Sequence, residues 1–230
     1  MKRVSTNKAA PRPAAPLAAE PDASLPVVET FCSLQGEGLH MGRSAFFIRL
    51  GGCTVGCSWC DTKHSWPSDS HPRQTLEALL AASQAAAEGG AAFVVITGGE
   101  PLHHDLGPLC TALAHCGLPL HLETSGVDPL SGRFDWITLS PKRHNPPRAA
   151  LLRHCHELKV VVSCDADLGF AETMAQQACA LRQETQQAAP ALLLQPAWDN
   201  PEGLRLALSH VRRHPAWRLS LQTHKWLAIR

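Results

Sequence analysis

Residues 51–62 read GGCTVGCSWCDT, and within them Cys53, Cys57 and Cys60 follow the spacing C-x3-C-x2-C, with no fourth cysteine to continue it. Three thiolates on one short loop can hold three irons of a cubane iron–sulfur cluster and leave the fourth iron without a protein ligand. An electron-transfer cluster normally takes four cysteines, whereas a catalytic metal keeps an open coordination position for its substrate. The spacing therefore predicts an open [4Fe-4S] cluster at which a small molecule binds and reacts.

The same cysteines also permit two other interpretations. Structural zinc takes four nitrogen or sulfur ligands, often as two CxxC pairs, and this segment has one such pair, Cys57 and Cys60. Cys32 or His64 could supply a fourth ligand, either to zinc or to a closed four-ligand cluster. We favour the open cluster because other segments of the chain agree with it.

Size and composition limit the class of protein. The chain has 230 residues, near one large domain or two small ones, and its hydrophobic content of 44% is ordinary for a folded protein. A net charge of +1 gives no broad electrostatic footprint for nucleic acid. No apolar run approaches the ~18 residues of a membrane span, and no secretory signal pattern is present. We therefore interpret the nine cysteines as reduced thiols of a cytoplasmic protein.

Two parts of the chain differ in pattern. Residues 1–24 are rich in alanine and proline and lack periodicity, which predicts a disordered tail. Over residues 25–230, short apolar runs alternate with helical patterns, which predicts one domain of strand–helix units. The apolar runs predict strands over residues 45–50, 92–96, 118–122, 136–139, 158–162, 191–194 and 217–221, and helices are expected over residues 75–88, 105–116, 166–184 and 201–213.

The expected units are too few for a closed barrel, because an eight-unit βα barrel takes ~250 residues, or roughly 30 for each unit. The residues after the tail allow about six units. We therefore expect an α/β fold in the form of a partial, open βα barrel with about six parallel strands. The connections over residues 123–134 and 142–155 look too short for full helices, and loops or single turns are expected there.

Polar or glycine-bearing segments follow five of the expected strands. The cysteine loop follows the first, and residues 97–101 (TGGEP), 123–126 (ETSG), 140–142 (SPK) and 195–196 (QP) follow four others. Functional groups collect where the carboxyl ends of parallel strands meet. The sequence therefore predicts one site at this rim for an extended polar ligand, with the glycines of TGGEP letting a ligand approach the backbone.

Residues 33–38 (SLQGEG) and Arg49 precede the cysteines and extend the candidate site. Gln35 and Glu37 together provide donor and acceptor atoms, as the amino-pyrimidinone edge of a pterin requires. Arg49 can make a bidentate bond to a carboxylate. The alternative for Arg49 is an interior ion pair with Glu37 or Glu123.

The cysteine spacing, with an aromatic residue just before the last cysteine, resembles the signature of the radical S-adenosylmethionine (SAM) superfamily. Together with SLQGEG, FIRLGGC at residues 47–53, the rim segments and QTHK at residues 222–225, it is similar to the 7-carboxy-7-deazaguanine synthase family of that superfamily. The resemblance covers residues 26–230. The cysteine loop alone specifies only the superfamily, while the Gln-Gly-Glu segment and residues 61–62 (DT) are the specific parts.

This resemblance implies a carbon–nitrogen lyase of queuosine (7-deazapurine) biosynthesis. The family converts 6-carboxy-5,6,7,8-tetrahydropterin to 7-carboxy-7-deazaguanine with loss of ammonia, and it depends on a [4Fe-4S] cluster, SAM and Mg²⁺. The resemblance further implies a homodimer, a reductant such as flavodoxin and a small-molecule pterin substrate. No direct contact with nucleic acid or membrane is expected, although the pathway ends in tRNA modification.

The resemblance also implies roles for individual residues. Cys53, Cys57 and Cys60 hold the cluster, and Thr62 ligates Mg²⁺, for which the alternative is a plain turn hydroxyl. The residues expected to line SAM are Trp59, Cys60, Asp61, Gly99, Ser125, Ser140, Pro141, Lys142 and Gln195. The residues expected to contact the pterin are Leu34, Gln35, Gly36, Glu37, Arg49 and Thr97, with Arg49 and Glu37 as catalytic residues.

Two rival functions remain at this stage. A radical SAM activase that makes a glycyl radical on a partner protein shares the cysteine loop, but it does not need the pocket around Gln35 and Glu37. An electron-transfer or structural cluster protein would take Cys32 as its fourth ligand.

Overall fold

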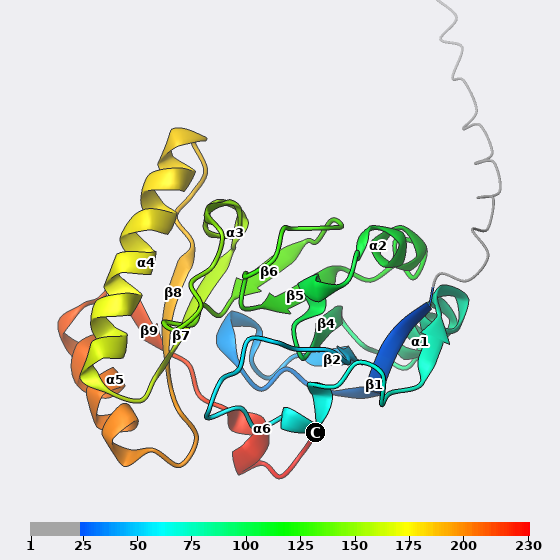
Figure 1. Ribbon diagram of the computed structural model, residues 1–230, viewed down its shortest axis with the longest axis horizontal. Helices are drawn as coiled ribbons and strands as arrows, with labels where there is room; N and C mark the ends of the chain where they lie inside the picture. The colour runs from blue at the N-terminus through cyan, green and yellow to red at the C-terminus, as the bar shows by residue number, and fades with distance from the viewer. Residues whose placement is uncertain (1–23) are drawn as a thin grey trace, which may run out of the picture.

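The computed structural model describes residues 24–230, and within them the strands form a single nine-stranded sheet in the order β3-β1-β2-β4-β5-β6-β7-β8-β9 (Figure 1). Neighbouring strands are parallel along β2-β4-β5-β6-β7-β8-β9, whereas β1 pairs antiparallel with β2 on one side and with the short edge strand β3 on the other. The strands are β1 (Ser24–Leu34), β2 (Ser44–Leu50), β3 (Arg73–Thr75), β4 (Val94–Gly98), β5 (Leu120–Thr124), β6 (Trp136–Leu139), β7 (Glu157–Val162), β8 (Ala191–Pro196) and β9 (Trp217–Leu219).

Helices connect the parallel strands, except between β5 and β6, and they cover one face of the sheet. Figure 1 shows α4 and α5 at the end of the sheet that holds β7 to β9, and α1 and α2 near the other end. Local chemistry sets where some helices begin: the Asn200 side chain accepts a hydrogen bond from Gly203 N at 2.8 Å, and Pro201 occupies the first turn of α5. The helices are α1 (Leu76–Glu88), α2 (Gly107–Leu113), α3 (Ala149–His154), α4 (Asp165–Glu184), α5 (Pro201–Arg213) and α6 (Thr223–Trp226).

The expected fold class is confirmed: the sheet is open, mostly parallel and covered by helices. All seven expected strands are present, so the parallel part has one strand more than the expected six. The sequence pattern missed the antiparallel strands β1 and β3, because β3 is short and polar and β1 carries polar residues and a proline instead of a continuous apolar run. Residues 1–23, most of the predicted tail, lie outside the described residues, and Ser24, which we assigned to the tail, begins β1.

The expectation for the two short connections was half right. Residues 123–134 contain no helix, as expected. In contrast, residues 142–155 contain α3, a six-residue helix that we expected to be a loop or single turn. Leu151 and Leu152 are almost completely buried, and this packing stabilises a helix that is too short to be predicted from local sequence.

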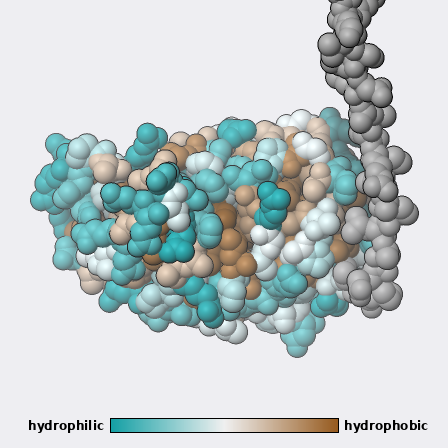
Figure 2. Space-filling model, turned by 90° about the horizontal axis from the view of Figure 1, so that it is seen from above, coloured by the Kyte–Doolittle hydropathy of each residue, from teal (hydrophilic) through white to brown (hydrophobic). Residues whose placement is uncertain are grey.

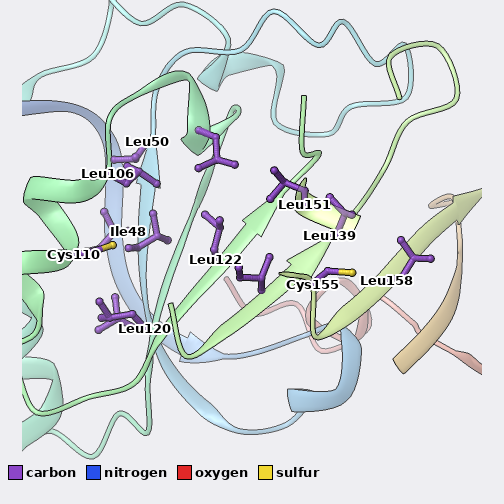
Figure 3. Close-up of a cluster of buried hydrophobic side chains, with 14 of the residues drawn as sticks. Ile48, Leu50, Leu106, Cys110, Leu120, Leu122, Leu139, Leu151, Cys155 and Leu158 are labelled. Atoms are coloured by element: carbon purple, nitrogen blue, oxygen red, sulfur yellow. The ribbon is translucent and has the colours of Figure 1, made fainter. Parts of the chain in front are cut away.

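Strand alternation divides the apolar side chains into two clusters. One face of the sheet packs against the helices, and Figure 3 shows Ile48 of β2, Leu122 of β5 and Leu158 of β7 in this larger cluster together with Leu106 and Cys110. The opposite face carries a smaller cluster of Ala45, Phe47, Phe93 and Val95. We call this opposite face the inner face. Towards the carboxyl ends of the same strands the inner face carries polar side chains, and they line a cleft.

Figure 2 displays a face with mixed polar and apolar side chains, in which apolar groups lie between larger polar areas. Among the helices of the described part of the chain, none combines the length and the hydropathy that crossing a bilayer requires.

Candidate active site

A cleft of about 310 Å³ lies at the carboxyl ends of the parallel strands. It brings together all predicted site residues except Pro141, which is buried but does not line the cleft. The register of β2 and β4 places Arg49 opposite Thr97, two residues predicted to contact the same ligand. The predicted residues that line the cleft are Leu34, Gln35, Gly36, Glu37, Arg49, Cys53, Cys57, Trp59, Cys60, Asp61, Thr62, Thr97, Gly99, Ser125, Ser140, Lys142 and Gln195.

The three cysteines of the C-x3-C-x2-C loop all face this cleft. Cys57 is buried, Cys53 and Cys60 are partly buried, and burial raises the pKa of the Cys53 and Cys57 thiols. Cys32 and His64, the possible fourth ligands, do not line the cleft, and Cys32 is exposed on β1. Within residues 24–230, the cleft therefore offers three thiols and no fourth, a donor set that fits a cluster with one open iron.

The glycines of the TGGEP turn hold the turn against the cysteine loop. A Cβ on Gly98 would lie 2.1 Å from the carbonyl oxygen of Leu50, and a Cβ on Gly99 would lie 2.3 Å from that of Gly52. In this narrow space Gly99 N donates to the Leu50 carbonyl at 3.0 Å, and Glu100 N donates to the Gly52 carbonyl at 2.9 Å. The space that we expected a ligand to use is thus partly filled by the protein's own backbone.

Glu100 joins the ends of β4 and β5. This buried carboxylate accepts a hydrogen bond from Ser125 N at 2.8 Å, from the Ser125 hydroxyl and from the Thr124 hydroxyl. Ser125, which we expected to bind a cofactor, therefore already uses its hydroxyl to bind Glu100.

The other residues predicted to line SAM lie on the rim beside the cysteines. Lys142 Nζ donates to Ser140 Oγ at 2.7 Å, and burial lowers the pKa of Lys142. Gln195 is buried and accepts a hydrogen bond from Ser220 Oγ at 2.8 Å. Asp61 forms an ion pair with Lys225 of α6.

A buried lysine that was not predicted from the sequence organises the part of the cleft that holds Gln35 and Glu37. Lys159 Nζ, on a side chain only 3% exposed, contacts Glu37 Oε2 at 2.5 Å and Glu123 Oε2 at 3.0 Å. Gln35 joins the same network, because its Nε2 donates to Glu123 Oε1 at 3.2 Å. The available signal was a lysine in the middle of the apolar run at residues 158–162.

Charge pairing sets the protonation states in this network. Burial would raise the pKa of Glu37, but the ammonium group of Lys159 outweighs burial and lowers that pKa to about 2. Burial raises the pKa of Glu123. Burial would lower the pKa of Lys159, yet the surrounding carboxylates of Glu123, Glu37 and Glu157 raise it. Lys159 and Glu37 are therefore both charged at neutral pH.

Arg49 pairs with a partner that we did not expect. Its Nε donates to Glu29 Oε1 at 3.0 Å, rather than to Glu37 or Glu123. Arg230 binds the other oxygen of Glu29 at 3.1 Å, and both guanidinium groups lie against the Phe31 ring. Within the described residues the terminal nitrogens of Arg49 make no hydrogen bond, so they can bind a carboxylate.

The segment QTHK forms α6 and the residue before it, and it covers the SLQGEG segment. Gln222 Nε2 donates to Glu37 Oε1 at 3.0 Å. His224 packs so closely on Gly36 that a Cβ there would lie 2.2 Å from His224 Nδ1. These contacts with residues 36 and 37 could not be predicted from the sequence, because contacts between segments so distant in the chain have no local signal.

The chain matches known proteins over this region. A family model described as Radical SAM superfamily matches residues 47–158. A 7-carboxy-7-deazaguanine synthase from Prochlorococcus marinus is 53% identical over 220 residues, which cover 89% of this chain and 98% of that protein. The synthase of the same name from Escherichia coli is 35% identical over 227 residues, covering 89% of this chain and 98% of that protein. The crystal structure of QueE from Escherichia coli superposes with a TM-score of 0.72 at 34% identity, covering 86% of this chain and 93% of that one.

Proposed function

The chain belongs to the 7-carboxy-7-deazaguanine synthase family of the radical SAM superfamily, and on that premise we propose that its cleft converts 6-carboxy-5,6,7,8-tetrahydropterin to 7-carboxy-7-deazaguanine with release of ammonia. One observation carries this proposal. A single cleft contains both the three-cysteine loop and the Gln35, Glu37 and Arg49 side chains, so a reactive cofactor and a pterin carboxylate can meet there.

The superfamily depends on a [4Fe-4S] cluster and SAM, and the donor set of the cleft fits them. Cys53, Cys57 and Cys60 would hold the cluster. When bound, the cluster and SAM supply a 5′-deoxyadenosyl radical that abstracts hydrogen from the substrate carbon bearing the carboxylate. The chain itself contributes orientation and exclusion of water.

Residues beside the cysteines would bind SAM. Lys142 and Ser140 already form a hydrogen-bonded pair at this rim, and a cation there suits the SAM carboxylate. The supporting observation for the others is their place in the cleft next to the cysteine loop, which is lined by Trp59, Cys60, Asp61, Gly99, Ser125 and Gln195. Pro141 is buried between Ser140 and Lys142, which both line the cleft.

Arg49 and the charged network around Lys159 would bind the pterin. The Glu29 bond leaves the terminal nitrogens of Arg49 for the substrate carboxylate. Gln35 and the ionised Glu37 offer a donor and acceptors for the amino-pyrimidinone edge. Leu34, Gly36 and Thr97 complete the walls of this part of the cleft.

Mg²⁺ and the cellular context are further parts of the proposal. Thr62 lines the cleft with its hydroxyl 3.6 Å from Cys60 Sγ, and Mg²⁺ usually takes few protein oxygens and completes its shell with substrate and water. Every cysteine in the described part of the chain is free, which suits the reducing cytoplasm and a reductant such as flavodoxin. We further propose that residues 25–230 act as one catalytic domain and that the enzyme works as a homodimer.

The direct test is anaerobic reconstitution of the cluster, followed by incubation with SAM, a reductant and 6-carboxy-5,6,7,8-tetrahydropterin with and without Mg²⁺. We expect 7-carboxy-7-deazaguanine to accumulate without matching consumption of SAM. A protein with a verified cluster that cleaves SAM but never forms this product would contradict the proposal.

Three variants separate the rival functions. A glycyl-radical activase should tolerate Glu37→Gln and Arg49→Ala, whereas the proposed synthase should lose its affinity for the pterin. Cys32→Ala should keep a complete cluster and still cleave SAM. Loss of the cluster in Cys32→Ala would instead identify a closed, four-cysteine site.

A further inference from the structure

Three histidines hold the backbone of the cysteine loop, and each uses its Nε2 atom. His103 Nε2 lies 3.0 Å from both Thr54 N and Thr54 Oγ1. His104 Nε2 lies 2.8 Å from the Gly51 carbonyl oxygen, and His144 Nε2 lies 3.0 Å from the Val55 carbonyl oxygen. The bonded positions therefore span residues 51–55, on both sides of Cys53.

The loop backbone assigns the proton of each imidazole. A backbone N–H can only donate, so His103 Nε2 accepts from Thr54 N and the proton of His103 sits on Nδ1. A carbonyl can only accept, so His104 and His144 carry their protons on Nε2. The three side chains thus supply one acceptor and two donors that match the loop.

Asp128 fixes the orientation of His103. Its Oδ2 accepts the hydrogen bond from His103 Nδ1, and this bond leaves Nε2 as the acceptor that Thr54 N–H needs. The arrangement runs Asp128–His103–Thr54 and connects the segments that follow β5 and β4 to the cysteine loop. In metal sites a carboxylate often orients the histidine that binds the metal. Here the carboxylate orients a histidine that binds the backbone of the ligand loop instead.

The loop needs such external bonds because it makes few of its own. Residues 51–60 contain no helix or strand. Four of their backbone N–H groups donate to backbone carbonyl groups: Gly51 to Pro26, Gly52 to Ser65, Cys53 to Trp66 and Cys60 to Cys57. Of these bonds, only the last lies within the loop. Thr54 is exposed, so burial does not hold it in place either.

We propose that His103, oriented by Asp128, is a positioning residue that preorganises the cysteine loop before the cluster binds. The inference rests on the proposed role of Cys53, Cys57 and Cys60 as cluster ligands. A loop already held in its binding conformation loses less conformational entropy when the cluster binds and therefore holds it more tightly. His104 and His144 support the same loop through its carbonyl groups.

The test compares His103→Ala with wild type and with His115→Ala, a change at an exposed histidine of the surface. Hydrogen–deuterium exchange of the cluster-free protein is the first measurement. We expect the Thr54 amide to exchange about fivefold faster in His103→Ala, which corresponds to the loss of one hydrogen bond. The second measurement is the rate at which a ferrous chelator removes iron from the reconstituted proteins, and it should rise in the same variant only.

A conservative variant distinguishes positioning from general destabilisation. The amide oxygen of glutamine can occupy the place of Nε2, so His103→Gln should restore slow exchange at Thr54 and slow loss of iron. Asp128→Asn should give intermediate values, because asparagine still accepts a hydrogen bond but carries no charge. If His103→Ala does not fold, these two variants still provide the comparison.

Different results would contradict the positioning role of His103 and the proposed reaction. Wild-type exchange and iron loss in His103→Ala, with a normal cluster, would overturn the positioning role and leave the proposed reaction intact. A wild-type protein that never takes up a three-cysteine cluster would overturn the proposed function itself.

Discussion

The two ends of the inner face of the sheet differ in the charge of their buried polar side chains. On β5, His121 and Glu123 lie two residues apart and so face the same side. Near the amino end, His121 stacks on Phe93 with ring centroids 4.1 Å apart, and burial lowers the pKa of His121 to about 3. At the carboxyl end, Glu123 contacts the ammonium group of Lys159. Burial thus leaves His121 neutral at pH 7, whereas Lys159 and Glu37 beside Glu123 stay charged because they pair with each other.

The amino end is held together by ring stacking instead of ion pairs. His40 and Trp136 pack edge to face with centroids 4.6 Å apart, and Trp136 also stacks on His156. Within the described residues, His40 Nε2 and Trp136 Nε1 are buried without a hydrogen-bond partner. The amino end of the inner face is therefore suited to packing, and the carboxyl end is suited to binding polar ligands.

The largest effect should follow the loss of the buried cation. Lys159→Met leaves Glu37 and Glu123 without their counter-charge, and we expect it to lower the free energy of unfolding by about 3–5 kcal/mol. Urea denaturation of the cluster-free protein measures this change. The exposed Lys63→Met serves as the matched control and should change stability by less than ~0.5 kcal/mol. Equal effects of the two substitutions would refute the special role of the buried pair.

A pH-dependent effect should come from the amino end. The folded pKa of His121, about 3, lies below the ordinary histidine pKa of 6.5, so the unfolded chain binds the proton more readily. Stability is therefore complete above pH 6.5 and falls as the pH drops towards 3. This histidine contributes a loss of ~1.4 kcal/mol for each pH unit, or about 2 kcal/mol at pH 5.

His121→Phe keeps the aromatic stacking and removes this proton, so its stability should fall less steeply between pH 6.5 and pH 5. Thermal unfolding at several pH values measures the slope. An unchanged slope would mean that His40 and His156, whose pKa values burial also lowers, account for the acid sensitivity instead.

Glu37→Gln should have a somewhat smaller effect on stability, because Glu123 still pairs with Lys159. The folded pKa of Glu37 is about 2, below the ordinary glutamate pKa of 4.5, so its contribution to stability is present above pH 4.5 and disappears as the pH falls towards 2. We expect a loss of about 1.5 kcal/mol at pH 7. The difference from wild type should shrink below pH 4.5, and a constant difference across that range would contradict the ion-pair explanation.

The smallest effect should come from a change that touches neither end of the inner face. Asn200→Ala removes the hydrogen bond to Gly203 N at the start of α5 and should cost about 1 kcal/mol. Its pH profile should parallel that of wild type, and pterin binding by the reconstituted enzyme should not change. Altered binding would show that the helical layer, as well as the cleft itself, sets the shape of the site.

Particular residues show how far the sequence could be interpreted. The strands buried on both faces were predictable because each is a nearly continuous apolar run, such as residues 158–162. β1 was not predicted, because Pro26, Glu29 and Thr30 interrupt its run of apolar residues. The rim residues followed from their positions after strands and the other cleft residues from the family resemblance, but the partners of Arg49 and Glu37 followed from neither. Glu29 is 20 residues from Arg49 and Lys159 is 122 residues from Glu37, and local pattern carries no information on such pairs.

By itself, the sequence determined the open parallel sheet, the rim that carries the polar segments and the three thiols of the cysteine loop. These features depend on apolar periodicity and on residue type, and both can be read locally. Only the tertiary structure decided that Lys159 holds Glu37 and Glu123, that Glu29 orients Arg49 and that histidines from separate segments hold the cysteine loop. The physical reason is that hydrogen bonds and ion pairs act over a few ångströms in space, whatever the distance along the chain.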